Sequence, residues 1–280
     1  MLFLGRRLWQ DGGERQRTML GWFLPSVFLG PAQRRLSARG VPIFCFHKIA
    51  DPPRGTADPF LYVRPGRFAA QLAALRRWGF GAASVAEARA ARDNRERRVV
   101  LAFDDGYVNV LENGLERLAQ HGHKAIQFLV AGRLGGRNEW DIAKGDVPEA
   151  LMDAGQVRDW LGAGQEIGSH SMSHRDLRRL SAAEAREEIG ASKRALEDRF
   201  GLAVRHFCYP YGVWNEAVRD LVGEAGYETA CTLVFGVNRA ATPPLELRRI
   251  MPLSGSELLA KAWHRAARAA RRGKRPGRGG

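Results

Sequence analysis

Short apolar runs recur along the middle of this 280-residue chain, each closed by glycine, proline or charged residues. Runs of four to nine apolar residues between such breaks are typical of buried strands. The run that ends in Ala102-Phe103-Asp104-Asp105-Gly106 is the most abrupt, because it passes directly into two adjacent carboxylates. We predict strands at residues 41–49, 98–103, 124–130, 166–171, 206–209, 229–234 and 245–253.

The segments between these runs carry apolar residues at three- and four-residue spacing, as amphipathic helices do. Ser84 and Ser181 are each followed three residues later by glutamate, which is the pattern of a capping box at a helix start. We predict helices at residues 65–79, 84–91, 109–121, 156–161, 181–201 and 215–226.

Regular alternation of strands and helices predicts parallel strands, and seven or eight such units can close into a barrel. An open doubly wound sheet is the alternative α/β architecture. The chain has neither a G-x-G-x-x-G sequence after a first strand nor a Walker loop, which argues against the nucleotide-binding forms of that sheet.

Polar residues that could carry chemistry gather where the predicted strands end. They are His47, the pair Asp104 and Asp105, the pair His170 and His174, and the sequence Tyr209-Pro210-Tyr211-Gly212. In parallel α/β folds the carboxyl ends of the strands form the site. We therefore expect these side chains to meet at one end of the sheet.

Two adjacent carboxylates repel each other and are costly to bury without a nearby positive charge. His170 and His174 are four residues apart, so a single helical turn would place both imidazoles on one side. Two imidazoles and one carboxylate can bind a divalent transition metal and leave positions open for water and substrate. One aspartate would then bind the metal, and the other could take a proton from a water whose pKa the metal lowers.

These motifs together resemble the polysaccharide deacetylase family, over residues 41–253. The family sequence T-F-D-D-G corresponds to Ala102-Phe103-Asp104-Asp105-Gly106, H-[ST]-x-x-H to His170-Ser171-Met172-Ser173-His174, and the P-Y-G motif to Pro210-Tyr211-Gly212. The resemblance implies a distorted (β/α) barrel of about seven parallel strands. It also implies hydrolysis of N-acetyl or O-acetyl groups on sugars.

By this resemblance, Asp104 is the general base, and Asp105, His170 and His174 hold the metal, for which zinc is the expected ion. The backbone N–H of Tyr211 would help to hold the oxyanion. Pro210, Trp140, Asp141 and Trp214 are assigned to substrate contact.

Two positions depart from the family pattern. Cys208 stands where many members have an arginine that steadies the base, and Arg248 or Arg249 could replace it. The late histidine that often serves as general acid is also absent. Some members use an early strand instead, and Phe46-His47-Lys48-Ile49 resembles that strand, so we expect His47 to be the catalytic acid.

The net charge of +14 is concentrated at the two ends of the chain. Residues 1–40 carry seven arginines and two acidic residues, and residues 254–280 carry eight lysines or arginines and one glutamate. We predict a basic N-terminal segment at residues 1–40, whose Trp22–Phe23 run could lie in a membrane interface or pack on the domain, a catalytic domain at 41–253, and a basic helix and tail at 254–280. The nearly neutral middle argues against nucleic acid as a partner, and basic ends attract anionic membranes.

Three cysteines without C-x-x-C spacing are expected to be buried and reduced, which favours the cytoplasm. We therefore expect an N-deacetylase that acts on a polysaccharide or lipid-linked glycan at the cytoplasmic membrane face. The alternative is a catalytically impaired barrel that binds carbohydrate or serves as a scaffold. The oligomeric state does not follow from the sequence.

Overall fold

The computed structural model describes residues 37–252, which belong to one compact unit spanning residues 34–252. The predicted interfacial run and the basic C-terminal helix lie outside the described residues. Within residues 37–252, every helix is too short or too polar to cross a membrane.

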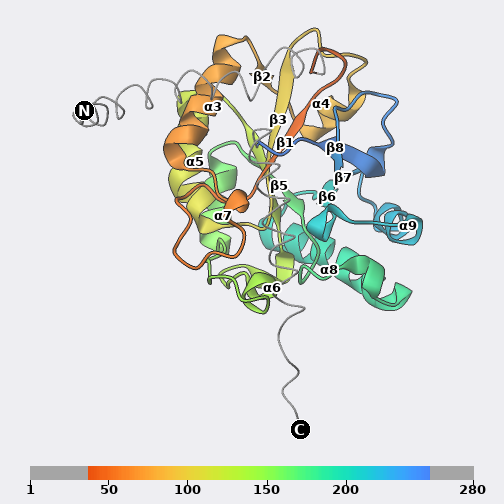
Figure 1. The fold of residues 1–280 in the computed structure, drawn as a ribbon. Helices are drawn as coiled ribbons and strands as arrows, with labels where there is room; N and C mark the ends of the chain where they lie inside the picture. Colours follow the sequence, from red (N-terminus) through yellow and green to blue (C-terminus); the bar gives the residue numbers. More distant parts are fainter. Residues whose placement is uncertain (1–36, 253–280) are drawn as a thin grey trace, which may run out of the picture. The chain divides into compact units, whose positions relative to one another are not determined.

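The centre of the fold is a sheet of parallel strands in the order β1-β3-β4-β5-β6-β7-β8, with the short β2 paired to the start of β3 (Figure 1). Ile250, just past β8, exchanges backbone hydrogen bonds with β1: the N–H of Cys45 donates to its carbonyl and its N–H donates to Ile43. These bonds bring the two edges together, so the sheet is a nearly closed barrel. The strands are β1 (Ile43–Phe46), β2 (Gly81–Ala82), β3 (Arg98–Phe103), β4 (Ala125–Leu129), β5 (Glu166–Ser169), β6 (His206–Cys208), β7 (Thr229–Phe235) and β8 (Leu247–Arg249).

Helices cover the outside of the barrel, with α3, α5 and α7 neighbours on one flank and α8 and α9 neighbours on another (Figure 1). Both predicted capping boxes are present, at Ser84 and Ser181, and the long α8 ends at Gly201 in the left-handed conformation. The helices are α3 (Pro65–Arg77), α4 (Val85–Ala90), α5 (Val108–Gln120), α6 (Glu139–Ile142), α7 (Ala154–Gly162), α8 (Ala182–Phe200) and α9 (Glu216–Glu224).

The core around β3 explains why this strand has a rigid position. Phe103 packs against Phe46 with ring centroids 5.3 Å apart and edge-on against Trp160 at 6.1 Å. Such aromatic pairs contribute about 0.5–1.5 kcal/mol beyond the area that they bury. The packing of this strand therefore holds Asp104 and Asp105, which follow it, in fixed positions.

The predicted barrel is confirmed, and the differences concern two short unpredicted elements, β2 and α6, and the ends of the other elements. The two-residue β2 was not predicted, because its Gly-Ala sequence carries no strand pattern. Most of the other strands are shorter than their apolar runs, since several of those residues continue into the loops that build the site.

Candidate active site

Asp104 and Asp105 follow β3 directly and turn away from each other. The N–H of Asp104 still donates to the carbonyl of Phe46, as a continuation of the strand pairing. Asp105 then adopts a left-handed backbone conformation with φ of 76°, followed by Gly106 with φ of 89°. This turn gives each carboxylate its own set of neighbours.

The carboxylate of Asp105 meets both histidines of the predicted metal site. Its Oδ1 lies 3.3 Å from Nε2 of His170 and 3.3 Å from Nε2 of His174. All three side chains are buried. Oδ1 of Asp105 accepts no hydrogen bond of normal geometry from the described residues 37–252. Tetrahedral zinc with oxygen and nitrogen ligands separates them by about 3.4 Å. The three residues therefore fit a divalent metal ion.

The two histidines do not share a helical turn, so that prediction was wrong. Residues 170–174 form an irregular loop in which Ser171 and His174 have φ of 66° and 62°. The hydroxyl of Ser171 accepts a hydrogen bond from the His174 N–H, and Glu188 of α8 accepts one from the Ser173 N–H at 2.9 Å. These bonds, rather than helical periodicity, aim both imidazoles at Asp105.

The tautomer of His170 follows from its backbone partner. Nδ1 of His170 lies 2.7 Å from the carbonyl oxygen of Cys208, which can only accept. Nδ1 must therefore carry the proton, which leaves the Nε2 lone pair for a metal. Cys208 thus contributes its carbonyl to the site.

Asp104 is paired with an arginine from the far end of the sequence. Nη1 of Arg249, in β8, donates to Oδ1 of Asp104 at 2.7 Å, and Nε of Arg249 donates to the carbonyl of Thr232 at 2.7 Å. The guanidinium is wholly buried. Burial alone would raise the pKa of Asp104, but Arg249, with His170 and His47, outweighs it and lowers that pKa to about 2. Arg249, and not the exposed Arg248, stands beside the predicted base.

The second oxygen of Asp104 faces a different set of groups. Oδ2 lies 3.9 Å from Nε2 of His47 and 3.6 Å from the Sγ of Cys45. The thiol of Cys208 lies 3.7 Å from both carboxylate oxygens. All three cysteines are buried and free, as predicted. His47, at the end of β1, is the partly exposed member of this set.

An open cleft of about 380 Å³ adjoins the trio of Asp105, His170 and His174. The Trp140 ring stacks on the imidazole of His174 at 4.4 Å, and the Tyr211 ring meets the same imidazole edge-on at 4.5 Å. Tyr211 is one of the few non-glycine residues with positive φ, at 60°, in the short helix that Pro210 opens. The cleft is lined by Arg133, Glu139, Trp140, Ser173, His174, Arg175 and Tyr211.

Asp141 lies close to Asp105, and Trp214 packs on a different residue. Burial, together with the charge of Asp105, raises the pKa of Asp141 to about 6, although Lys144 is only 3.6 Å from its carboxylate. The ammonium of Lys144 also donates to the hydroxyl of Tyr211 at 2.9 Å. Trp214 instead stacks on Tyr209 at 6.2 Å. Substrate contact by Pro210, Trp140, Asp141 and Trp214 stays a prediction.

Sequence reasoning missed a buried lysine beneath the site. Lys48 follows His47, and its ammonium lies 3.2 Å from the Tyr62 hydroxyl and 4.6 Å from the centre of the Tyr107 ring. The Tyr62 hydroxyl in turn donates to Glu149 at 2.6 Å. This network connects the end of β1 to the segment that follows α6, the short helix that carries Trp140. A charged residue within an apolar run was the only available signal.

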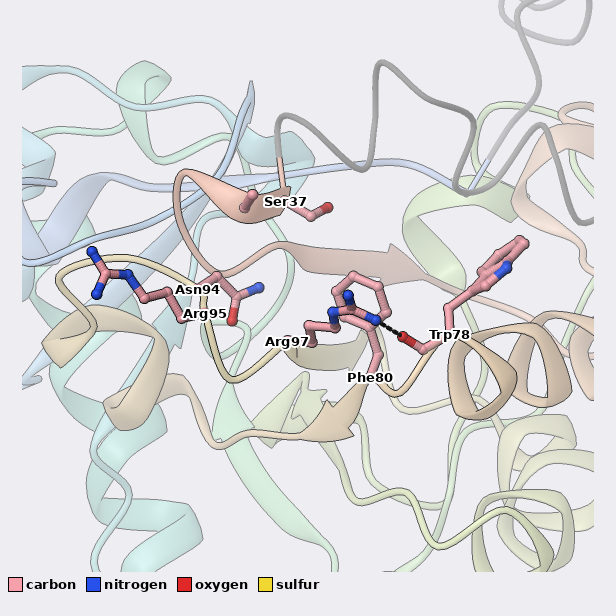
Figure 2. Close-up of a pocket in the computed structure, with 7 residues that line it drawn as sticks. Ser37, Trp78, Phe80, Asn94, Arg95 and Arg97 are labelled. Carbon is pink, nitrogen blue, oxygen red and sulfur yellow. Dashed lines mark hydrogen bonds between the residues drawn. The ribbon is translucent and has the colours of Figure 1, made fainter.

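A second pocket, of about 260 Å³, lies at the opposite end of the barrel (Figure 2). Its lining residues precede strands: Ser37 precedes β1, Phe80 precedes β2, and Asn94, Arg95 and Arg97 precede β3. Figure 2 shows Arg97 donating to the carbonyl of Trp78, at 2.9 Å. The residues that line this pocket include no carboxylate or imidazole, so it lacks the groups that the reaction would need.

Comparisons with known proteins agree with this geometry. The sequence model of polysaccharide deacetylases matches residues 91–230, a range that contains Asp104, Asp105, His170, His174 and Tyr211. The chain is 29% identical over 132 residues to the chitooligosaccharide deacetylase of Bradyrhizobium sp., covering 46% of this chain and 53% of that protein. The chain therefore spans about half the length of that relative.

Two solved structures share the fold over most of the chain. The Streptococcus pyogenes deacetylase PplD, in complex with acetate, is 25% identical, with a TM-score of 0.66 over 79% of this chain and 97% of that one. IcaB from Ammonifex degensii is 22% identical, with a TM-score of 0.66 over 81% of this chain and 97% of that one. With the family match over half of its residues and the same barrel around the site, the chain belongs to the polysaccharide deacetylase family.

Proposed function

We propose that this protein is a metal-dependent hydrolase that removes N-acetyl groups from a sugar. The observation that carries the proposal is the division of the two adjacent aspartates. Asp105 converges with two imidazoles at 3.3 Å, and Asp104 stays apart, paired with Arg249 at 2.7 Å.

Each group has a distinct role in this reaction. Asp105, His170 and His174 hold the metal, which when bound lowers the pKa of water and polarises the acetyl carbonyl. Asp104 is ionised at neutral pH, and its Oδ2, which Arg249 leaves available, accepts the proton of the attacking water. His47, 3.9 Å from Oδ2, donates a proton to the leaving amine. Tyr211 supplies a backbone N–H for the oxyanion.

The catalytically impaired alternative loses its main argument. It rested on the missing arginine near the base, and Arg249 supplies a guanidinium to Asp104 from β8. The base, its cation and the three metal-binding side chains are all present within residues 37–252.

We further propose an acetylated glycan of the cell envelope as substrate, polymeric or lipid-linked, with zinc as the metal. The named relative acts on chitooligosaccharide, which is a polymer fragment of N-acetylated sugar. The basic ends of the chain support peripheral contact with the anionic cytoplasmic membrane face. Partition of the full chain between buffer and vesicles of anionic or neutral lipid tests that contact.

The deciding experiment is acetate release by the metal-stripped protein, before and after Zn²⁺ is added back. Chitooligosaccharides, an N-acetylated exopolysaccharide and a lipid-linked N-acetyl sugar serve as parallel substrates. We expect release only with metal, and a rate lower by about 10²–10⁴-fold from the Asp104→Asn variant. Absence of release from every substrate by the metal-loaded protein would overturn the proposal.

A further inference from the structure

We propose that Cys45, His47 and Asp104 form a second transition-metal site, whose occupation inhibits the enzyme. The inference concerns regulation of the active site and rests on the proposed function only in its inhibitory part. Metal binding at this site can be measured without any substrate.

The ligand atoms already lie close to the spacing that a metal requires. Tetrahedral zinc separates a sulfur and an oxygen ligand by about 3.6 Å, and a nitrogen and an oxygen ligand by about 3.4 Å. The Sγ of Cys45 and Nε2 of His47 lie 3.6 Å and 3.9 Å from the same oxygen, Oδ2 of Asp104. One ligand atom from each of the three residues lies within 4.8 Å of the other two. A shift of about half an ångström in the partly exposed His47 ring would bring its Nε2 to the distance from Oδ2 of Asp104 that is expected for zinc ligands.

The two metal sites share no ligand. The first uses Asp105, His170 and His174, and the second uses residues at the ends of β1 and β3. A third combination, Asp104 with His170 and Cys208, would take His170 away from the first site. Among these clusters of the described residues, only the Cys45 set can therefore be filled while the first metal stays bound.

The charges of the neighbourhood make the second site the weaker one. With His47 neutral, binding Zn²⁺ there releases the Cys45 thiol proton to solvent and so adds one net positive charge to a buried region. With His47 protonated, its Nε2 proton leaves as well. Arg249 already holds a positive charge at Oδ1 of Asp104, and a metal held by the neighbouring Asp105 would add another. The negative charge of the thiolate offsets part of this repulsion. Sulfur ligands also favour zinc, cadmium and Co²⁺ over magnesium or calcium.

Occupation of this site removes both proton-transfer groups at once. Oδ2 of Asp104 could no longer accept a proton, and Nε2 of His47 could no longer donate one. Loss of one such group costs about 10²–10⁴-fold in rate. Activity should therefore rise with the first equivalent of Zn²⁺ and fall by at least tenfold in excess.

Cobalt titration of the metal-stripped protein provides the test, because thiolate-to-Co²⁺ charge transfer absorbs in the near ultraviolet. The first equivalent should give no such band, since the first site has no sulfur, and the second equivalent should give it. In Asp105→Asn the band should come with the first equivalent. A titration without a thiolate band at any cobalt concentration would overturn the proposal.

Serine variants assign the band to one thiol. Cys45→Ser should abolish it and relieve inhibition by excess Zn²⁺, measured against the same variant's activity at one equivalent. Cys231→Ser is the matched control, a buried thiol outside every candidate metal cluster of residues 37–252, and should keep both properties. Loss of the band in Cys208→Ser but not in Cys45→Ser would refute the assignment. If Cys45→Ser does not fold, retention of the band in both other variants still assigns it to Cys45.

The two proposals fail separately. A second-equivalent band without acetate release from any substrate would overturn the proposed function and leave the second site in place. Acetate release without a thiolate band and without inhibition by excess Zn²⁺ would overturn the second site and leave the proposed function in place.

Discussion

The two carboxylates after β3 are neighbours in sequence and have opposite surroundings. Both are buried, and both have pKa values below the ordinary range despite burial. Asp105 owes this to the contacts with His170 and His174, beside the open cleft. Asp104 owes it to Arg249, inside the barrel. We therefore expect the two acids to differ in role, because neutral imidazoles beside Asp105 can bind a metal and the permanent cation beside Asp104 keeps that carboxylate ionised.

Removing the Asp105 carboxylate should have the largest effect on metal content and turnover. Asp105→Ala takes one of three ligands, so the metal retained after dialysis against a chelator should fall from about one per chain to near zero, because the Cys45 site is the weaker one. Turnover should fall by more than about 10⁴-fold, beyond the loss expected for a general base alone. Metal analysis and acetate release on the same preparation check this. Full metal content in Asp105→Ala would show that the ion binds elsewhere.

Removing the Asp104 carboxylate should separate proton transfer from metal binding. Asp104→Asn keeps the size of the side chain and leaves the three metal-binding residues untouched. We expect metal content close to one and a loss of about 10²–10⁴-fold in kcat/KM. Turnover near the wild-type rate with metal bound would exclude Asp104 as the base.

Replacing Arg249 should weaken the base without removing it. In Arg249→Met the pKa of Asp104 should rise, because burial then acts without its main opposing charge. The acidic limb of the pH–kcat/KM profile should move to higher pH, and Arg249→Lys should restore part of the shift. Arg248→Met, at the exposed neighbouring position, is the matched control. An unchanged acidic limb in Arg249→Met would count against the pairing.

The pair of Asp104 and Arg249 should also contribute to the free energy of unfolding. The pKa of Asp104 in the folded protein, about 2, lies below the unfolded value of about 3.9. Its contribution to the free energy of unfolding is therefore complete above about pH 4 and is lost as the pH falls towards 2. Breaking a buried pair costs about 3–5 kcal/mol, so denaturant unfolding of Arg249→Met at pH 7 should show a loss of that order. A loss equal to that of Arg248→Met would contradict this.

The smallest effect is expected at the cleft wall. Trp140→Ala removes an aromatic ring from the lining of the cleft, and stacking of such a ring on a bound sugar would contribute about 0.5–1.5 kcal/mol. KM should rise by up to about tenfold, with kcat nearly unchanged and full metal content. Trp78→Ala, in the pocket at the other end of the barrel, should leave KM unchanged. A fall in kcat without a change in KM would assign Trp140 to support of His174 instead of substrate.

The sequence by itself determined the barrel, the family and the residue types of the site. Apolar runs that end in carboxylates or histidines can be read locally, because each strand brings its own end to the same edge of the sheet. The capping boxes at Ser84 and Ser181 are equally local. The roles of Asp104 and Asp105 came from the family resemblance.

Only the tertiary structure decided the partners of those residues. Arg249 reaches Asp104 across 145 positions, since β7 and β8 close the barrel beside β1. The spacing of His170 and His174 suggested a helical turn, and bonds to Ser171 and Glu188 made a loop instead. Cys45 and His47 share one oxygen of Asp104 because β1 pairs with β3. Contacts between distant strand ends depend on barrel closure and register, which no local pattern encodes.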